Sequence, residues 1–312
     1  MQIRSMVESD LGRILTCLET QSVNTTTPER FNEFLTTRAY RPEWTWLAVE
    51  GEQILALSVW WGLDGYEKPF ALDCLYADES VVEPSALWAD LLRQMVDQFE
   101  PEDEQPEYHL FLSTEWRSDP KIQAEVEPRL AAAAAVGLTG LTERLRFEWT
   151  AAEGLPDRSS RLTFRAEPDD EAFVDVLQRV AKGTLDASTA RAVVRIGAEG
   201  AAREELETYR SLPGDRAWWR LAYNAENELI GFAIPSANNG GPVVGYLGIL
   251  PEHRGHRYVD DLLAEITHIL AETGAEVIRA DTDFGNVPMA AAFERAGYQH
   301  FATRLVASHP GG

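Results

Sequence analysis

The sequence has few cysteines, a shortage of basic residues and no long apolar run, and each of these excludes a class of protein. Its 312 residues include only two cysteines, Cys17 and Cys74, each inside an apolar segment. Reduced core thiols fit this pattern better than a disulfide framework or a metal site. No apolar run is long enough to span a bilayer, and the first ten residues carry charges, so we expect neither a membrane anchor nor a signal peptide. We therefore expect a cytoplasmic protein without a metal.

Basic residues are greatly outnumbered by acidic ones. The 28 Lys and Arg residues face 51 Asp and Glu residues, which gives a formal net charge of -23. Such a surface repels nucleic acids and anionic membranes, so neither is expected as a partner. The charge suits a cationic small substrate, although an acidic surface that serves solubility explains it better.

The chain carries a weak internal repeat. Gly137 and Arg144 near the middle match Gly297 and Arg304 near the end, and "WTWLAVEGEQILAL" resembles "WWRLAYNAENELIGF". Two further pairs follow in the same order, at offsets of about 160 to 174 residues, which indicates a duplicated domain. We predict domains over 1–152 and 158–312, because glycine, proline and serine interrupt the pattern between them.

Each half has the pattern of a strand, helices, a strand hairpin, and then strands alternating with helices. This pattern predicts the α/β (α+β) class, with a mixed, mostly antiparallel twisted sheet flanked by helices in each domain. The strands expected in the second half are 161–166, 217–223, 228–235, 243–250, 277–282 and 298–307.

The segment "PEHRGHRYVDDLL", residues 251–263, joins an apolar strand to an amphipathic helix. Free backbone N–H groups at a helix N-terminus form an anion site. Arg254 and Arg257 add positive charge, Gly255 allows a tight turn, and His256 lies between them. A solvated basic turn is the alternative interpretation.

A second segment, "NVPMAAAFERAGY", begins at Asn286. Pro288 suits the first turn of a helix, and Gly297 suits its end. Taken alone, Asn286 is best explained as the N-cap of this helix.

Together the two segments resemble the GNAT superfamily of acyl-CoA-dependent N-acyltransferases. The second segment follows the family pattern N-x-x-A/M-x-x-x-Y/F-x-K/R-x-G-F/Y. With the repeat, the chain resembles tandem GNAT proteins such as mycothiol synthase-like enzymes and some antibiotic N-acetyltransferases. The positions that match the pattern are Asn286, Met289, Phe293, Arg295, Gly297 and Tyr298.

The resemblance implies that acetyl-CoA is the cosubstrate and that the loop holds its pyrophosphate. The family's R/Q-x-x-G-x-G/A pattern aligns with Arg254, Gly255, His256, Arg257, Tyr258 and Val259, with Arg257 and Val259 as departures. By the same resemblance, the backbone of Ile249 and Leu250, together with Asn286, Met289 and Phe293, would contact the pantetheine arm and the thioester. The corresponding loop of the first half has Glu79 and Glu83 and neither arginine nor glycine, so we expect the cofactor in the second half alone.

Transfer to an amine requires a proton acceptor, since an alkyl amine has a pKa of about 10.4. Tyr246, Asp281 and Asp283 are the catalytic candidates, although a core aromatic and turn residues explain them as well. Phe293 stands where many family members have a tyrosine that acts as general acid, and Tyr298 could replace that donor.

The sequence thus predicts an N-acetyltransferase that acts on a primary amine of a small molecule. The alternative is a catalytically weak acyl-CoA-binding or scaffolding protein. Both a monomer and a homodimer are compatible with this sequence.

Overall fold

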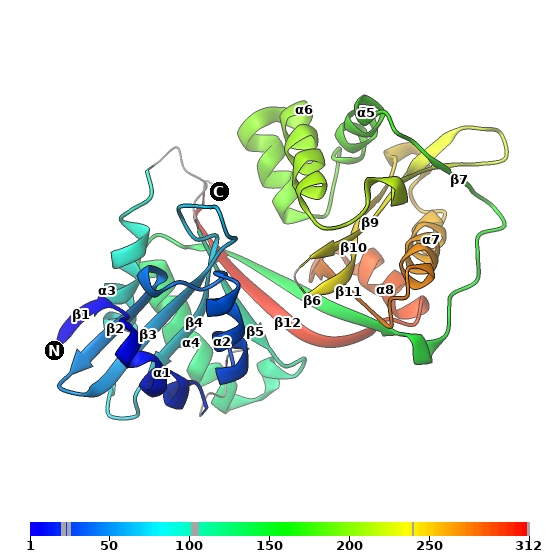
Figure 1. Ribbon diagram of the computed structural model, residues 1–312. Helices are drawn as coiled ribbons and strands as arrows, with labels where there is room; N and C mark the ends of the chain where they lie inside the picture. The colour runs from blue at the N-terminus through cyan, green and yellow to red at the C-terminus, as the bar shows by residue number, and fades with distance from the viewer. Residues whose placement is uncertain (20–22, 24–25, 101–105, 239, 311–312) are drawn as a thin grey trace. The chain divides into compact units, whose positions relative to one another are not determined.

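The computed structural model describes residues 1–19, 23, 26–100, 106–238 and 240–310. The chain divides into two compact units, which are coloured by residue number in Figure 1. Unit 1 consists of Met1–Glu143 and Thr303–Gly312, and unit 2 of Arg144–Ala302.

Unit 1 contains one mixed sheet with strand order β1-β2-β3-β4-β5-β12. Its pairs are antiparallel except for β4 and β5, which run parallel. The elements are β1 (Gln2–Ser5), α1 (Leu11–Leu18), α2 (Pro28–Thr36), β2 (Thr45–Glu50), β3 (Gln53–Trp61), β4 (Ala71–Ala77), α3 (Pro84–Val96), β5 (Glu107–Leu112), α4 (Pro120–Ala135) and the C-terminal strand β12 (Gln299–Ser308).

Unit 2 repeats this arrangement with strand order β7-β8-β9-β10-β11-β6, and here β10 and β11 are the parallel pair. The predicted strands and helices of the second half are confirmed to within a few residues. The elements are β6 (Gly140–Thr150), β7 (Thr163–Ala166), α5 (Asp170–Val180), α6 (Ala187–Ser211), β8 (Arg220–Tyr223), β9 (Leu229–Asn238), β10 (Gly241–Ile249), α7 (Tyr258–Glu272), β11 (Val277–Asp283) and α8 (Val287–Arg295).

The last strand of each half completes the sheet of the other half. Residues 144–150 of β6 pair with β11 in unit 2, and residues 303–307 of β12 pair with β5 in unit 1. The bounds of the compact units therefore differ from the expected domains 1–152 and 158–312. The difference arises because β6 pairs with β11 and β12 pairs with β5, so each strand belongs to the unit of its partner.

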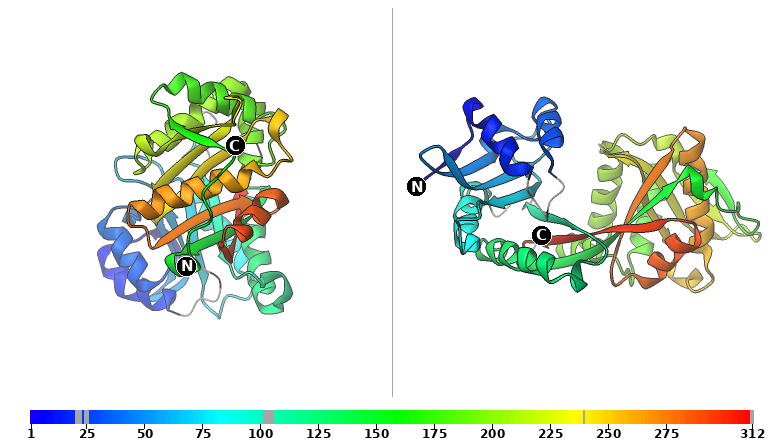
Figure 2. Two further views of the ribbon diagram at one scale, coloured as in Figure 1. Left: turned by 90° about the vertical axis from the view of Figure 1, so that its right-hand side faces the viewer. Right: turned by 90° about the horizontal axis from the view of Figure 1, so that it is seen from below.

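Each sheet is covered by helices on both faces. In unit 2, Leu221 and Phe232 pack with α5 and α6, while their neighbours Ala222 and Ala233 pack with α7 and α8. This alternation follows from the period of two along a strand. In unit 1, α1 and α2 lie on one side of the sheet and α3 and α4 on the other, which the right-hand view of Figure 2 shows.

The glycines that mark the sequence repeat have the same local conformation. Gly137 follows α4 with φ 94°, and Gly297 follows α8 with φ 85°. Glycine adopts this left-handed conformation at little cost and ends helices in this way. The repeat in sequence thus corresponds to a repeat in backbone geometry.

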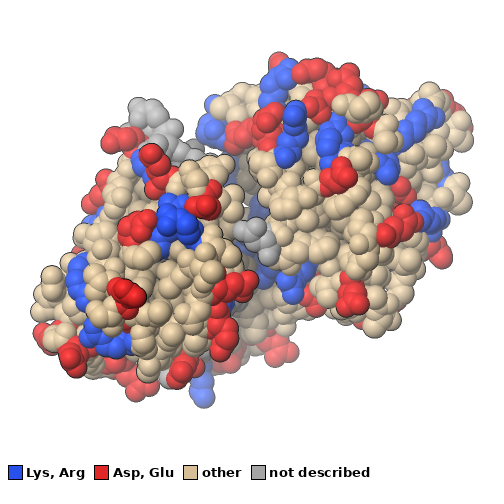
Figure 3. All heavy atoms as spheres, in the orientation of Figure 1, with Lys and Arg blue, Asp and Glu red and all other residues tan. Residues whose placement is uncertain are grey.

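Acidic and basic side chains are interspersed on the face shown in Figure 3, in both units. In the described ranges no helix is long and apolar enough to cross a membrane. The same residues contain no cluster of three or more His, Cys, Asp or Glu side chains placed to hold a metal ion.

Candidate active site

A cleft of about 490 Å³ opens in unit 2 where β10 and β11 diverge. The two strands share a single parallel register pair, Val243 with Arg279. On its other edge, β10 has a bulge between Val244 and Tyr246, where its pairing with β9 shifts by one residue. The cleft is lined by residues 244–249 of β10, by α6 and the segment before it, by the loop that precedes α7, and by the start of α8.

Most of the residues singled out in the sequence meet in this cleft. Nine of the eleven predicted cofactor-binding residues line it, together with the catalytic candidates Tyr246 and Asp281. Those nine are Ile249, Arg254, Gly255, Arg257, Tyr258, Val259, Asn286, Met289 and Phe293. Asp283, Leu250 and His256 are not part of the cleft wall.

The loop before α7 presents backbone N–H groups to the cleft. Gly255 and Arg257 both have left-handed backbones, with φ 84° and φ 59°. Arg161 donates from Nη1 to the carbonyl of His256 over 3.0 Å and from Nη2 to the carbonyl of Arg257 over 3.2 Å. Because N–H and C=O point in opposite directions across a trans peptide, the N–H groups of Arg257 and Tyr258 point away from Arg161.

The positive character of this helix end is preserved despite two aspartates in its first turn. Asp260 forms an ion pair with Arg295, with 2.5 Å between Oδ1 and Nη2, and Asp261 forms one with Arg161. No described residue accepts a hydrogen bond from the backbone N–H groups of residues 255–259. The loop therefore offers unused donors and the guanidinium of Arg257 to an anion.

Arg254 has a different role from the phosphate contact that the motif suggests. Its guanidinium donates to four backbone carbonyls at 2.7–3.2 Å, three at the end of α5 and one on β10. These bonds satisfy carbonyls that a helix C-terminus leaves open. Arg254 thus ties α5 to the loop, and its donors are largely used there. The four carbonyls belong to Val180, Lys182, Gly183 and Ile249.

Leu250 also differs from the expectation. Its side chain is fully buried. Its N–H donates to the carbonyl of Ile230, and its own carbonyl accepts from His253, both over 2.9 Å. Both backbone groups are engaged within the protein, so they are not available to a pantetheine arm. His256 is exposed, and its ring lies beside that of Tyr258.

Asn286 caps α8 and also lines the cleft. Its side-chain oxygen accepts from the N–H of Met289 over 3.4 Å, which leaves its amide NH₂ group to donate elsewhere. Phe293, one helical turn further along α8 from Met289, is buried and stacks on Phe147 with ring centroids 5.0 Å apart. Tyr298 is buried and bonded to Thr267 over 2.8 Å, outside the cleft wall.

The two predicted aspartates are held by arginines. Asp281 forms an ion pair with Arg146 at 3.3 Å. Asp283 is buried, pairs with Arg144 at 3.1 Å and accepts the N–H of Ala187 over 2.6 Å. Burial raises the pKa of Asp283 although Arg144 and that N–H act in the opposite direction. Neither carboxylate is placed as a free proton acceptor, so a structural role fits both better.

Tyr246 is part of the cleft wall. Its ring stacks on Tyr209 and forms an edge-to-face pair with Phe232, and its hydroxyl is 3.2 Å from the hydroxyl of Thr189. Burial raises the pKa of Tyr246 well above the usual value for tyrosine. The phenol therefore stays protonated and is suited to donate a hydrogen bond rather than to accept a proton.

Glu205 on α6 is a cleft residue that the sequence analysis did not single out. It is partly buried in the cleft wall, and no described residue forms a hydrogen bond or an ion pair with it. Desolvation raises its pKa to about 7, and the charges of Asp186 and Glu204 act in the same direction while Arg144 opposes them. In the sequence "AREELETYR" it is one acidic residue among several on a charged helix, a pattern typical of a solvated surface.

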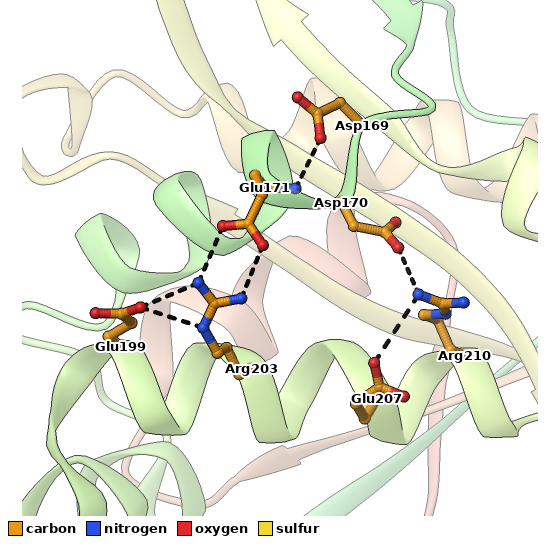
Figure 4. A network of polar contacts seen from close by, with 7 residues as sticks. All are labelled: Asp169, Asp170, Glu171, Glu199, Arg203, Glu207 and Arg210. Atoms are coloured by element: carbon orange, nitrogen blue, oxygen red, sulfur yellow. Dashed lines mark hydrogen bonds and ion pairs between the residues drawn. The ribbon is translucent and has the colours of Figure 1, made fainter.

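The helical segment that carries Glu205 is fixed to α5 by a network of ion pairs, shown in Figure 4. Arg203 binds both carboxylate oxygens of Glu171 at 2.8 and 3.0 Å, and Arg210 binds Asp170 at 2.5 Å. α6 is interrupted at Gly197, whose φ of 77° is not helical. The network anchors the part of α6 after this break, and with it the position of Glu205.

In unit 1, the end of the corresponding strand, β4, forms hydrogen bonds with side chains of α3 and α4. The end of β4 is covered by two buried side chains: Trp88 donates to the carbonyl of Tyr76 over 2.7 Å, and Arg129 to the carbonyl of Leu75 over 3.2 Å. The guanidinium of Arg129 lies 4.8 Å from the ring of Trp88. Side chains of α3 and α4 thus satisfy backbone groups of β4, whereas the matching stretch of β10 faces the cleft.

Comparison with known families agrees with this geometry. Residues 191–298, from α6 to Tyr298, match the model of the acetyltransferase (GNAT) family. The matched residues all lie within unit 2. The matched GNAT segment includes the loop, the diverging strands and α8, and so most of the cleft. No curated protein matches the chain in sequence.

Solved structures show the same fold over nearly the whole chain. A GCN5-related N-acetyltransferase from Sphaerobacter thermophilus has 14% identity and a TM-score of 0.63, with 98% of this chain and 94% of that chain covered. A glucosamine N-acetyltransferase region of a fungal multidomain β-N-acetylglucosaminidase has 12% identity and a TM-score of 0.58, with 98% and 38% covered.

A tandem GNAT protein from the clavulanic acid biosynthesis pathway has 16% identity and a TM-score of 0.49, with 100% of this chain and 99% of that chain covered. In the present chain, the two units share one order of elements and one strand order. The chain therefore contains two units of the same fold, and the family match within unit 2 supports an N-acyltransferase.

Proposed function

We propose that unit 2 transfers the acetyl group of acetyl-CoA to the primary amine of a small molecule. One observation carries this proposal: a single cleft is lined both by the loop before α7 and by Glu205. Among the described residues, none accepts a hydrogen bond from the backbone N–H groups of residues 255–259, and none pairs with the carboxylate of Glu205. The two ends serve the two reactants, an anionic cosubstrate and an amine.

The donors of the loop suit the diphosphate of coenzyme A. The loop that precedes α7 lines the cleft, Arg257 included, and a helix N-terminus favours negative charge. Asn286 would donate its amide hydrogens to the pantetheine arm, and the exposed edge of β10 would pair with it. Arg257 supplies charge at the position where the family usually has glycine, and it keeps the left-handed backbone.

Glu205 is the proton acceptor in this proposal. Acetyl-CoA supplies an activated acyl group. The amine must lose its proton to attack, and a carboxylate with a pKa of about 7 is ionised at slightly alkaline pH yet basic enough to accept that proton. The amine nitrogen forms the new bond to the acyl carbon, the carbon–sulfur bond breaks, and the amine proton passes to Glu205.

Tyr246 is the donor to the departing sulfur. Its phenol remains protonated because burial raises its pKa. Phe293 has no proton to give, and the hydroxyl of Tyr298 is buried against Thr267. A hydrogen bond from Tyr246 stabilises the departing thiolate, which then takes a proton from solvent, so the products are an amide and a thiol.

Two measurements test the proposal. Calorimetric titration with acetyl-CoA is expected to give one site per chain, and release of the coenzyme A thiol is expected with one or more members of a panel of small primary amines. Arg257→Glu should weaken binding at least tenfold by reversing a charge in the cleft. Arg165→Glu, on β7 and bonded to Asn227, is the matched control and should bind normally.

The outcomes separate the proposal from its alternative. Absence of binding, or two sites per chain, contradicts it. Binding of one acetyl-CoA without release of the coenzyme A thiol in the presence of any amine favours the alternative, an acyl-CoA-binding protein. The absence of a hydroxyl on Phe293 supports that alternative.

A further inference from the structure

Arg161 lies outside both sequence motifs, close to the start of β7 and about 95 residues before the loop that it contacts. Its guanidinium reaches three groups there: the carbonyls of His256 and Arg257 and the carboxylate of Asp261. It also lies over the ring of Tyr258, 4.9 Å from its centroid. These contacts involve four consecutive or near-consecutive residues around the start of α7.

The loop needs such support because Arg257 is in an unfavourable conformation. Its backbone is left-handed, with φ 59° and ψ 23°. A residue with a Cβ atom adopts this region at a cost of roughly 1–2 kcal/mol relative to the right-handed one. The side chain of Arg257 forms no N-cap hydrogen bond. The conformation must therefore be held by neighbours, and Arg161 binds the carbonyl of this very residue.

We propose that Arg161 is a positioning residue for the cofactor loop, and this inference rests on the proposed function. Arg161 binds the carbonyls of His256 and Arg257, and so turns the N–H groups of Arg257 and Tyr258 toward the cleft. By pairing with Asp261 it also neutralises a negative charge near the proposed diphosphate site. A glycine at position 257 would adopt the left-handed backbone at little cost. With arginine at this position, the hydrogen bond from Arg161 stabilises the same backbone conformation.

The experiment is a double-mutant cycle with acetyl-CoA as the probe. Arg161→Ala is expected to raise both the Kd and the KM for acetyl-CoA on the order of tenfold, which corresponds to about 1.4 kcal/mol, with kcat changed less than twofold. Arg257→Gly removes the conformational cost, so Arg161→Ala should have a much smaller effect in that background. Arg158→Ala is the matched control, since Arg158 pairs with Glu272 and Glu265 and does not touch the loop.

A second readout needs no ligand. Limited trypsin digestion should cut after Arg254 or Arg257 faster in Arg161→Ala than in the wild type or in Arg158→Ala, because cleavage reports local opening of the loop. Unchanged affinity and unchanged digestion in Arg161→Ala would overturn the inference, and so would strictly additive effects in the cycle. A wild type that does not bind acetyl-CoA would instead overturn the proposed function, and digestion would still decide whether Arg161 holds the loop.

Discussion

Glu205 differs from the other acidic side chains around the cleft in the freedom of its carboxylate. Asp186 caps α6 and faces Arg144, while Asp281 and Asp283 are paired with arginines. Among the described residues none pairs with Glu205, and burial raises its pKa to about 7. A titrating carboxylate in a cleft is a candidate for acid–base chemistry.

Glu205→Gln is expected to lower kcat about 100- to 10,000-fold, the range for loss of a general base, and to leave acetyl-CoA affinity within about twofold. In the wild type, kcat/KM should rise as the pH increases through about 7, because Glu205 accepts a proton only when it is ionised and its pKa lies there. Steady-state rates between pH 5.5 and 9 measure both effects.

Glu204→Gln is the control for this substitution. Glu204 is adjacent on α6, exposed and paired with Arg195, so its loss should leave the maximal rate nearly unchanged. The rise of kcat/KM should move to slightly lower pH, because the charge of Glu204 helps to raise the pKa of Glu205. If Glu205→Gln keeps most of the activity or the rise near pH 7, another group accepts the proton.

At the scale of elements, the start of α8 forms part of the cleft wall, and the residue that caps this helix, Asn286, lines the cleft as well. Asn286 caps the helix through Met289 and presents its amide to the cleft. The sequence left open whether Asn286 is a cap or a ligand contact. The structure shows the cap, and its place in the cleft wall adds the second role to the proposal.

Substitution of Asn286 separates the two roles. Asn286→Ala should lower the free energy of unfolding by about 1 kcal/mol through loss of the cap and raise the KM for acetyl-CoA several-fold. Asn286→Ser retains a capping oxygen, so it should restore stability without restoring KM. Denaturant unfolding and steady-state kinetics measure the pair, and recovery of both by serine would mean that Asn286 is a cap alone.

At the scale of the whole molecule, the exchange of β6 and β12 makes the two units depend on each other. Each sheet has as its sixth strand a segment from the other half of the chain. Removing that segment would expose the paired edge of β5 or β11, and exposed edges promote association.

Fragments 1–154 and 155–312 test this exchange. Co-expressed, they should copurify as a one-to-one complex that binds acetyl-CoA, whereas each alone should be poorly soluble or self-associated. Size-exclusion chromatography with light scattering measures the complex. Two folded monomeric fragments with no affinity for each other would show that each half is complete with its own last strand.

The sequence by itself determined the elements of unit 2, the repeat and the loop that precedes α7. These depend on local patterns: alternation in the strands, apolar faces in the helices, and glycines at 255 and 297 where the backbone is left-handed. The α/β class and the resemblance to GNAT proteins followed from these same local segments.

Tertiary structure alone decided which strand completes which sheet, where the donors of Arg254 go, and which carboxylate stays unpaired. A strand pattern gives no partner, since β6 and β12 have equivalent patterns and the choice depends on pairing between residues far apart in the chain. In the same way, Asp283 and Glu205 are equally acidic in sequence, and only packing places an arginine beside the first and leaves the second in a cleft with a raised pKa.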